Sequence, residues 1–140
     1  MHALRLTILL ALLLTTLSGA WAAEIYILAN TGVPDKTLEK ASLERIYLGK
    51  KSQWSNGTRI VPVVLKSGST HTAFVKRFLD RDVSQFSTYW KQAVFTGRGM
   101  PPKAFDTEAE IVDYISSTPG AIGYTSFIPS TKPVIRITIK

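Results

Sequence analysis

The sequence contains no cysteine, and this absence excludes several kinds of chemistry. Without thiols the chain can form no disulfide and can offer no thiolate as a nucleophile or metal ligand. Histidine is almost as scarce, because only His2 and His71 are present. Two histidines with scattered carboxylates give no spacing typical of a metal site. We therefore expect a fold without disulfides, bound metal or cofactor.

Long hydrophobic runs are also absent, apart from one near the N-terminus. Residues 6–17 are apolar except for threonines, follow the positive charge of Arg5, and precede the small-residue motif Ala20-Trp21-Ala22. The run is too short to cross a bilayer, which takes about 20 apolar residues. This pattern predicts a secretory signal peptide over residues 1–22, cleaved after the motif, with an uncleaved anchor as the alternative. We expect residues 23–140 to form a single periplasmic domain.

Acidic residues are few, which leaves the chain basic. Ten Asp and Glu against 17 Lys and Arg give a net charge of +7. A basic protein attracts anions through its general field. The basic residues form no long run, so no nucleic-acid partner is expected. Nor does any acid–base pair or catalytic triad stand out, so we do not expect an enzyme.

The apolar periodicity predicts strands and helices in alternation. A helix from Asp35 or Thr37 to about residue 48 follows the first strand, and a capping box of Thr107 and Glu110 opens the last helix. The order is strand, helix, strand, three helices and two strands, which predicts an α/β fold with a small mixed sheet covered by helices. Strands are expected at residues 24–30, 58–65, 121–125 and 134–140, and helices also at residues 70–79 and 82–96.

Two details of this pattern bear on packing. Pro62 lacks an N–H donor, so it places the second strand near a sheet edge or a bulge. The helix over residues 82–96 has one face spaced for burial. That face comprises Phe86, Tyr89, Trp90, Ala93 and Val94.

The segment LKSGSTHTAFVKRFL, residues 65–79, carries the candidate site. A strand ends, a glycine-containing turn follows and a helix begins, and the first N–H groups of a helix have no partner within it. These groups and the helix dipole favour a bound anion. The candidate ligand-binding residues are Lys66, Ser67, Gly68, Ser69, Thr70, His71 and Thr72.

An ordinary helix start is the competing interpretation of this turn. Ser67 or Ser69 could cap the helix, as serine often does, and spacing alone favours this interpretation. A nucleophilic pair of Ser69 with His71 is not expected, because catalytic serine and histidine usually meet through the fold and need an acid to orient the histidine.

Four segments, taken in order, resemble one known family. They are LERIYLGKKSQWSNGTRIVPV (43–63), the turn GSTH (68–71), FTGRGMPP (95–102) and STPGAIGYTS (117–126). The set is similar to phosphate-binding proteins of bacterial ABC uptake systems, and the third segment is similar to their small, single-lobed members. The resemblance implies a periplasmic-binding-protein fold of type II, of which the chain has room for roughly one lobe.

In that family the turn binds phosphate through hydroxyls, backbone amides and an arginine. Gly68 and Ser69 match the family pattern, whereas Thr70 and His71 stand where a glycine and a threonine are expected. The arginine position is taken by Leu65. This departure leaves the site short of a cation.

Two residues could replace the missing arginine. Lys66 is adjacent in sequence, although neighbouring strand residues point to opposite faces and lysine cannot reproduce a bidentate contact. Arg98 lies in a glycine-flanked loop, where the alternative is a solvated side chain.

The resemblance implies an exported protein that binds a small oxyanion, phosphate first, for ABC-type uptake with a permease. The alternative is a periplasmic interaction or accessory protein that keeps the fold without tight ligand binding. Its partner would be a membrane sensor, a transporter subunit or a second copy of the chain in a homodimer.

Overall fold

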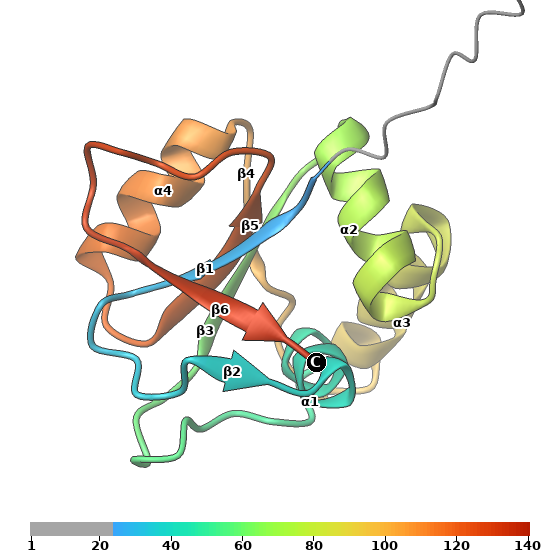
Figure 1. Cartoon of the computed structure of the whole chain (residues 1–140). Coiled ribbons are helices and arrows are strands. Elements are labelled where there is room, and N and C mark those ends of the chain that lie inside the picture. The colour runs from blue at the N-terminus through green and yellow to red at the C-terminus, as the bar shows by residue number, and fades with distance from the viewer. Residues whose placement is uncertain (1–23) are drawn as a thin grey trace, which may run out of the picture.

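The computed structural model describes residues 24–140, and the expected signal peptide lies outside them. Six strands and four helices follow in the order β1, β2, α1, β3, α2, α3, β4, α4, β5, β6 (Figure 1). The strands are β1 Tyr26–Ala29, β2 Thr37–Leu38, β3 Val61–Leu65, β4 Lys103–Phe105, β5 Ala121–Thr125 and β6 Ile135–Ile139. The helices are α1 Lys40–Tyr47, α2 Ser69–Leu79, α3 Val83–Phe95 and α4 Glu108–Ser117.

The strands form one mixed sheet in the order β2-β6-β1-β5-β3-β4. Strand β1 pairs antiparallel with β5 and β6, whereas β3 pairs parallel with both β5 and β4. Figure 1 shows α4 on one side of the sheet and α2 and α3 on the other. The expected α/β class, a small mixed sheet covered by helices, is confirmed.

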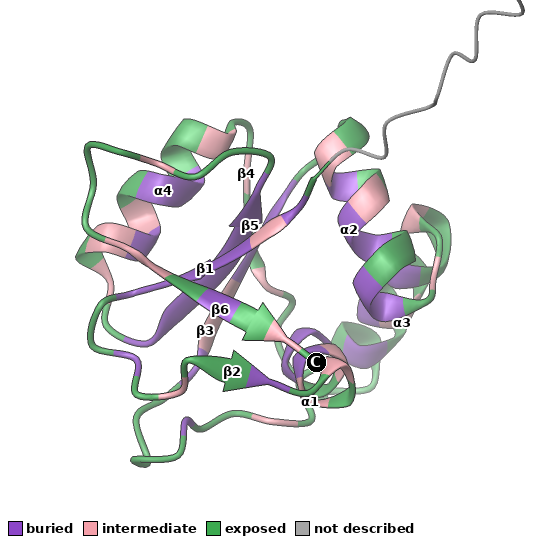
Figure 2. Ribbon diagram, in the orientation of Figure 1, coloured by how far each residue is buried: buried purple, intermediate pink, exposed green. Residues whose placement is uncertain are grey.

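The core is built around β5, which is buried on both faces. All five of its residues, Ala121–Thr125, are buried, as the purple ribbon of Figure 2 shows. Helix α4 packs closely on this strand at Gly123. A Cβ there would lie 2.9 Å from Ile115 Cδ1 and 2.9 Å from Val63 Cγ2. Only glycine fits between α4, β3 and β5 at this position.

We predict that Gly123→Ala lowers the free energy of unfolding by about 1–3 kcal/mol, because the added methyl group overpacks the contact. Gly99→Ala is the matched control, since its Cβ would meet nothing closer than Trp90 Cζ3 at 3.7 Å. Urea unfolding of both variants measures the difference. Equal stabilities of the two would contradict the close packing of α4.

Helix α1 begins later than the sequence predicts, and neither Asp35 nor Thr37 caps it. Its N-cap is Glu39, without a side-chain hydrogen bond. The preceding residues pair with β6 instead, with Thr138 N–H donating to the Lys36 carbonyl at 3.0 Å. The Asp35 carboxylate accepts from Ser55 N–H at 3.0 Å. The residues before Glu39 therefore form tertiary contacts instead of the first turn of the helix.

Strand β4 was not expected from the sequence, and it modifies the prediction for Pro62. Strand β3 is second from the edge of the sheet, next to β4. Pairing with β4 begins only at Val63, so at Pro62 the strand has β5 as its sole partner. Pro62 therefore lies at a position where β3 is not yet paired with β4, so its missing N–H donor breaks no pairing with that strand.

Helix α4 begins after the predicted N-cap, with Glu110 N–H donating to Thr107 Oγ1 at 3.2 Å. The reciprocal bond of the predicted capping box is not formed, because the Glu110 carboxylate accepts from Thr107 Oγ1 rather than from the Thr107 backbone. The expected inward face of α3 is confirmed for Phe86, Trp90 and Ala93, which are buried. It is wrong for Val94, which is 47% exposed. Val94 directly follows Ala93 and borders an open cavity rather than the sheet.

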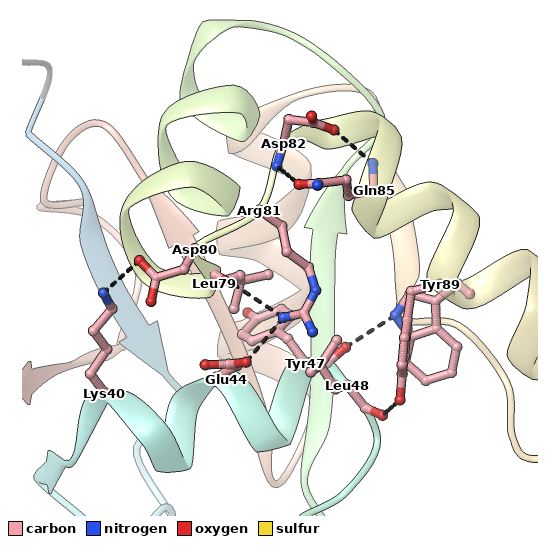
Figure 3. Close-up of polar contacts among 11 residues, drawn as sticks. Lys40, Glu44, Tyr47, Leu48, Leu79, Asp80, Arg81, Asp82, Gln85 and Tyr89 are labelled. Atoms are coloured by element: carbon pink, nitrogen blue, oxygen red, sulfur yellow. Dashed lines mark hydrogen bonds and ion pairs between the residues drawn. The ribbon is translucent and has the colours of Figure 1, made fainter.

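Polar contacts fix α3 to the ends of α1 and α2 (Figure 3). A capping box at the start of α3 joins Asp82 and Gln85 in both directions, at 2.7 and 2.9 Å. Arg81 donates to Glu44 on α1 at 3.0 Å. Tyr89 Oη donates to the carbonyl of Leu48 at 2.6 Å. The contacts of Arg81 and Tyr89 hold α3 against the C-terminal end of α1.

Candidate functional site

The turn from β3 to α2 leads into a helix start that has no side-chain cap. Lys66 N–H continues the sheet by donating to the Phe105 carbonyl at 2.9 Å. Gly68 is the N-cap, with φ of 102°, a conformation that favours glycine. Ser69 is the first residue of α2, so the interpretation that Ser67 or Ser69 caps the helix is wrong. No side chain of residues 24–140 therefore competes for the first N–H groups of α2.

The side chains of the turn differ in accessibility. Lys66, Ser67 and Ser69 are exposed, whereas Thr70 is half-buried. Thr72 is exposed, but its hydroxyl donates back to the Gly68 carbonyl at 3.0 Å. No acidic residue lies in the first turn of α2. The helix start thus presents hydroxyl and amide donors without a neighbouring carboxylate in that turn.

Of the two cations expected for this site, Lys66 lies at the turn and Arg98 does not. Lys66 Nζ lies 3.3 Å from Asp106 Oδ1, and both side chains are more than half exposed, so the ion pair is weak. Leu65, at the position of the family's arginine, is buried. Arg98 follows α3, where its N–H donates to the Ala93 carbonyl at 2.8 Å. Figure 1 shows this end of α3 low in the view, away from the start of α2.

His71 faces inward rather than joining the exposed turn. It is 4% exposed, and its Nδ1 lies 2.5 Å from Tyr124 Oη. The same Oη accepts from Leu65 N–H at 2.9 Å. The phenol proton then has His71 Nδ1 as its acceptor, which assigns the imidazole proton to Nε2. His71 is thereby held by β3 and β5 and makes no hydrogen bond with Ser69.

Burial keeps both partners of this pair neutral. It lowers the pKa of His71 below its ordinary value of 6.5. Burial also raises the pKa of Tyr124 far above its ordinary value; the Leu65 amide opposes this rise and Glu108 adds to it. His71 therefore contributes a hydrogen-bond donor at neutral pH and no positive charge.

The link between Tyr124 and His71 was not foreseen from the sequence. The Tyr124 ring stacks on Phe74, with centroids 3.8 Å apart. The available signal was that a buried tyrosine needs a hydrogen-bond partner. The partner lies 53 residues away, so the sequence could not identify it.

We predict that Tyr124→Phe destabilises the protein by about 1–3 kcal/mol, because Leu65 N–H loses its partner in the interior. Tyr114→Phe is the control, since Tyr114 is only half-buried and we expect a change within about 0.5 kcal/mol. Chemical denaturation measures both. Equal, small effects would show that the Tyr124 hydroxyl contributes nothing.

We also predict a pH dependence of stability from His71. The unfolded chain gains a proton at His71 as the pH falls through about 6.5, whereas the folded chain gains it only at lower pH. The free energy of unfolding therefore decreases below pH 6.5, down to the folded pKa. Unfolding measured between pH 7.5 and 5 should show a smaller decrease for His71→Gln. The same decrease in the variant would exclude His71 as the cause.

Residues 24–140 contain neither a metal-ligand cluster nor a helix that could span a membrane. That part of the chain has no group of three or more His, Asp or Glu residues placed to hold a metal ion. It also has no helix of sufficient length and hydrophobicity to cross a membrane.

The described fold matches that of periplasmic binding proteins. A phosphate ABC transporter substrate-binding protein from Clostridium perfringens, solved with bound phosphate, superposes with a TM-score of 0.63 at 19% identity, over 82% of this chain and 44% of that one. PstS from Borrelia burgdorferi gives 0.60 at 12% identity, over 82% and 46%. An ABC-type phosphate transport receptor from Vibrio cholerae gives 0.53 at 16%, over 82% and 45%.

The chain thus spans less than half of the length of these structures. The sequence matches no protein-family profile and no curated protein. The likeness therefore establishes the fold, a single-lobed periplasmic-binding-protein type, and the expected resemblance to phosphate-binding proteins is confirmed at the level of structure.

Proposed function

We propose that this chain binds a small oxyanion, phosphate first, at the β3–α2 turn, residues 66–72. The observation that carries the proposal is the uncapped start of α2, whose N-cap Gly68 offers no side chain. The phosphate-bound structure from Clostridium perfringens, which shares the fold, supports this choice of anion. The signal-like residues 1–22 support export, so we place the protein in the periplasm, serving an ABC permease.

Binding at this turn would involve hydrogen bonds and the helix dipole without covalent chemistry. The first amides of α2 point their hydrogens out of the helix, and the hydroxyls of Ser67, Ser69 and Thr70 add donors. Lys66 contributes the nearby positive charge. An exposed site of this kind is screened by salt, so affinity should fall as ionic strength rises.

We predict that phosphate binds in calorimetric titrations at low salt and that Ser69→Ala weakens it about three- to tenfold, which corresponds to the net contribution of one typical hydrogen bond. Ser130→Ala, an exposed serine in the loop before β6, is the control and should bind as the unaltered protein does. Sulfate, titrated in parallel, tests selectivity. Absence of binding by folded protein would make this turn an ordinary helix start.

The variant Asp106→Asn provides a second test of the proposed site in the same calorimetric titration. Asp106 is the ion-pair partner of Lys66 and places a negative charge near the turn. Its neutralisation frees Lys66 and removes repulsion, so phosphate affinity should increase about two- to fivefold at low salt. Loss of this gain at high salt would identify it as electrostatic. A decrease in affinity would contradict a site beside Lys66.

The accessory-protein alternative is favoured by a different observation. Phe95, the last residue of α3, and Met100, in the loop that follows, are 92% and 82% exposed. Exposed large apolar side chains of this kind mark interaction surfaces. If no oxyanion binds, a membrane sensor, a transporter subunit or a second copy of the chain becomes the expected partner.

A further inference from the structure

A cavity of about 680 Å³ opens between α3 and the end of the sheet formed by β3 and β4. We call it the α3 groove. One face of α3 lines its length, and the opposite wall comes from β3, β4 and the loop between α3 and β4. Its volume lies within the range of small-molecule sites, about 300–1,000 Å³. Its apolar lining includes Val83, Phe86, Trp90, Val94, Pro102 and Ala104.

The α3 groove has four polar lining residues, and two of them are cationic. Lys66 and Lys91 line it, together with the Ser87 hydroxyl and His71. Within residues 24–140, Lys91 is exposed and takes part in none of the salt bridges. No Asp or Glu is among the lining residues. The groove therefore combines an apolar interior with two cationic side chains, of which Lys66 is paired with Asp106 and Lys91 is in no salt bridge of residues 24–140.

His71 supplies the buried polar group. Its Nδ1 is held by Tyr124, so its Nε2 carries a proton and has no partner on the described part of the chain. No fully buried side-chain nitrogen or oxygen in that part lacks a hydrogen bond. Nε2 must therefore reach solvent, and His71 lines the α3 groove. The neutral Nε2–H is a fixed donor for an acceptor oxygen within the groove.

We propose that the α3 groove binds an amphipathic carboxylate, with its apolar body against α3 and its carboxylate near Lys66, Lys91 and His71 Nε2–H. Inorganic phosphate would leave the apolar walls without a contact, and burial of those walls supplies most of the affinity. A neutral or cationic amphiphile would leave the lysines unused or opposed. This site is distinct from the anion site proposed at the α2 start, although Lys66 borders both.

Decanoate, below its critical micelle concentration, is the probe. The purified protein is titrated by calorimetry, and quenching or enhancement of tryptophan fluorescence reports on Trp90 in the groove wall. Decanol and decyltrimethylammonium are the neutral and cationic comparisons. We expect saturable one-to-one binding of decanoate that is at least tenfold tighter than that of either comparison.

Two substitutions locate the ligand without touching the α2 start. Ala104→Trp places an indole in the groove from the exposed edge strand β4, and it should abolish binding. Ala109→Trp, at an exposed position on α4, is the matched control and should leave it unchanged. Lys91→Gln should weaken decanoate about three- to tenfold and leave decanol unaffected. Thermal unfolding of each variant confirms that it is folded.

Several results would overturn the proposal. They are the absence of decanoate binding to folded protein, binding that Ala104→Trp leaves intact, and equal affinities for decanoate and decanol. Sedimentation adds another: a dimer that Ala104→Trp dissociates would mean that a second copy covers the groove. If phosphate binds without displacing decanoate, both proposed sites are supported. If decanoate binds but phosphate does not, only the proposed site at the start of α2 is excluded.

Discussion

The Tyr124 hydroxyl is the contact on which the arrangement around the turn depends. It accepts from Leu65 N–H at the last residue of β3 and reaches His71 in the first turns of α2. One phenol on β5 therefore links the end of a neighbouring strand to the helix that follows it. The stack on Phe74 fixes the ring from the α2 side. The turn between Leu65 and His71 is short, and the Tyr124 hydroxyl forms a hydrogen bond at each of its ends. These two bonds therefore hold the backbone of the turn in its observed conformation.

Other aromatic side chains also use their polar atom to bind the backbone, in these cases as donors to carbonyl groups. Tyr47 Oη lies 3.2 Å from the Val63 carbonyl and 3.3 Å from that of Ile122, and Trp54 Nε1 donates to the Gly120 carbonyl at 3.0 Å. Trp90 Nε1 donates to the Tyr47 carbonyl at 3.1 Å. Large apolar rings with one polar atom can fill a core and also form hydrogen bonds with the backbone. This chain, which has no cysteine, connects its elements through such contacts.

The sequence predicts an element well where local signals determine its conformation, and poorly where pairing with distant residues determines it. Strand β5 and helix α3 were placed closely, because a continuous apolar run and a helical apolar face are local signals. The short strands β2 and β4 were missed, since their two and three residues take that conformation only by pairing with distant partners. At the site, residues 66–72 were found where a turn meets a helix, but the inward direction of His71 depends on Tyr124, far along the chain.

The position of β1 within the sheet has a consequence for how the chain is assembled. Leu28 of this first strand lies opposite Gly123 on one side and Arg136 on the other, so both neighbours come from the end of the chain. The centre of the sheet cannot form until almost the whole polypeptide is present. Contacts of such large sequence separation slow folding. During the export proposed above, the sheet would thus be unable to close until β6 had crossed the membrane.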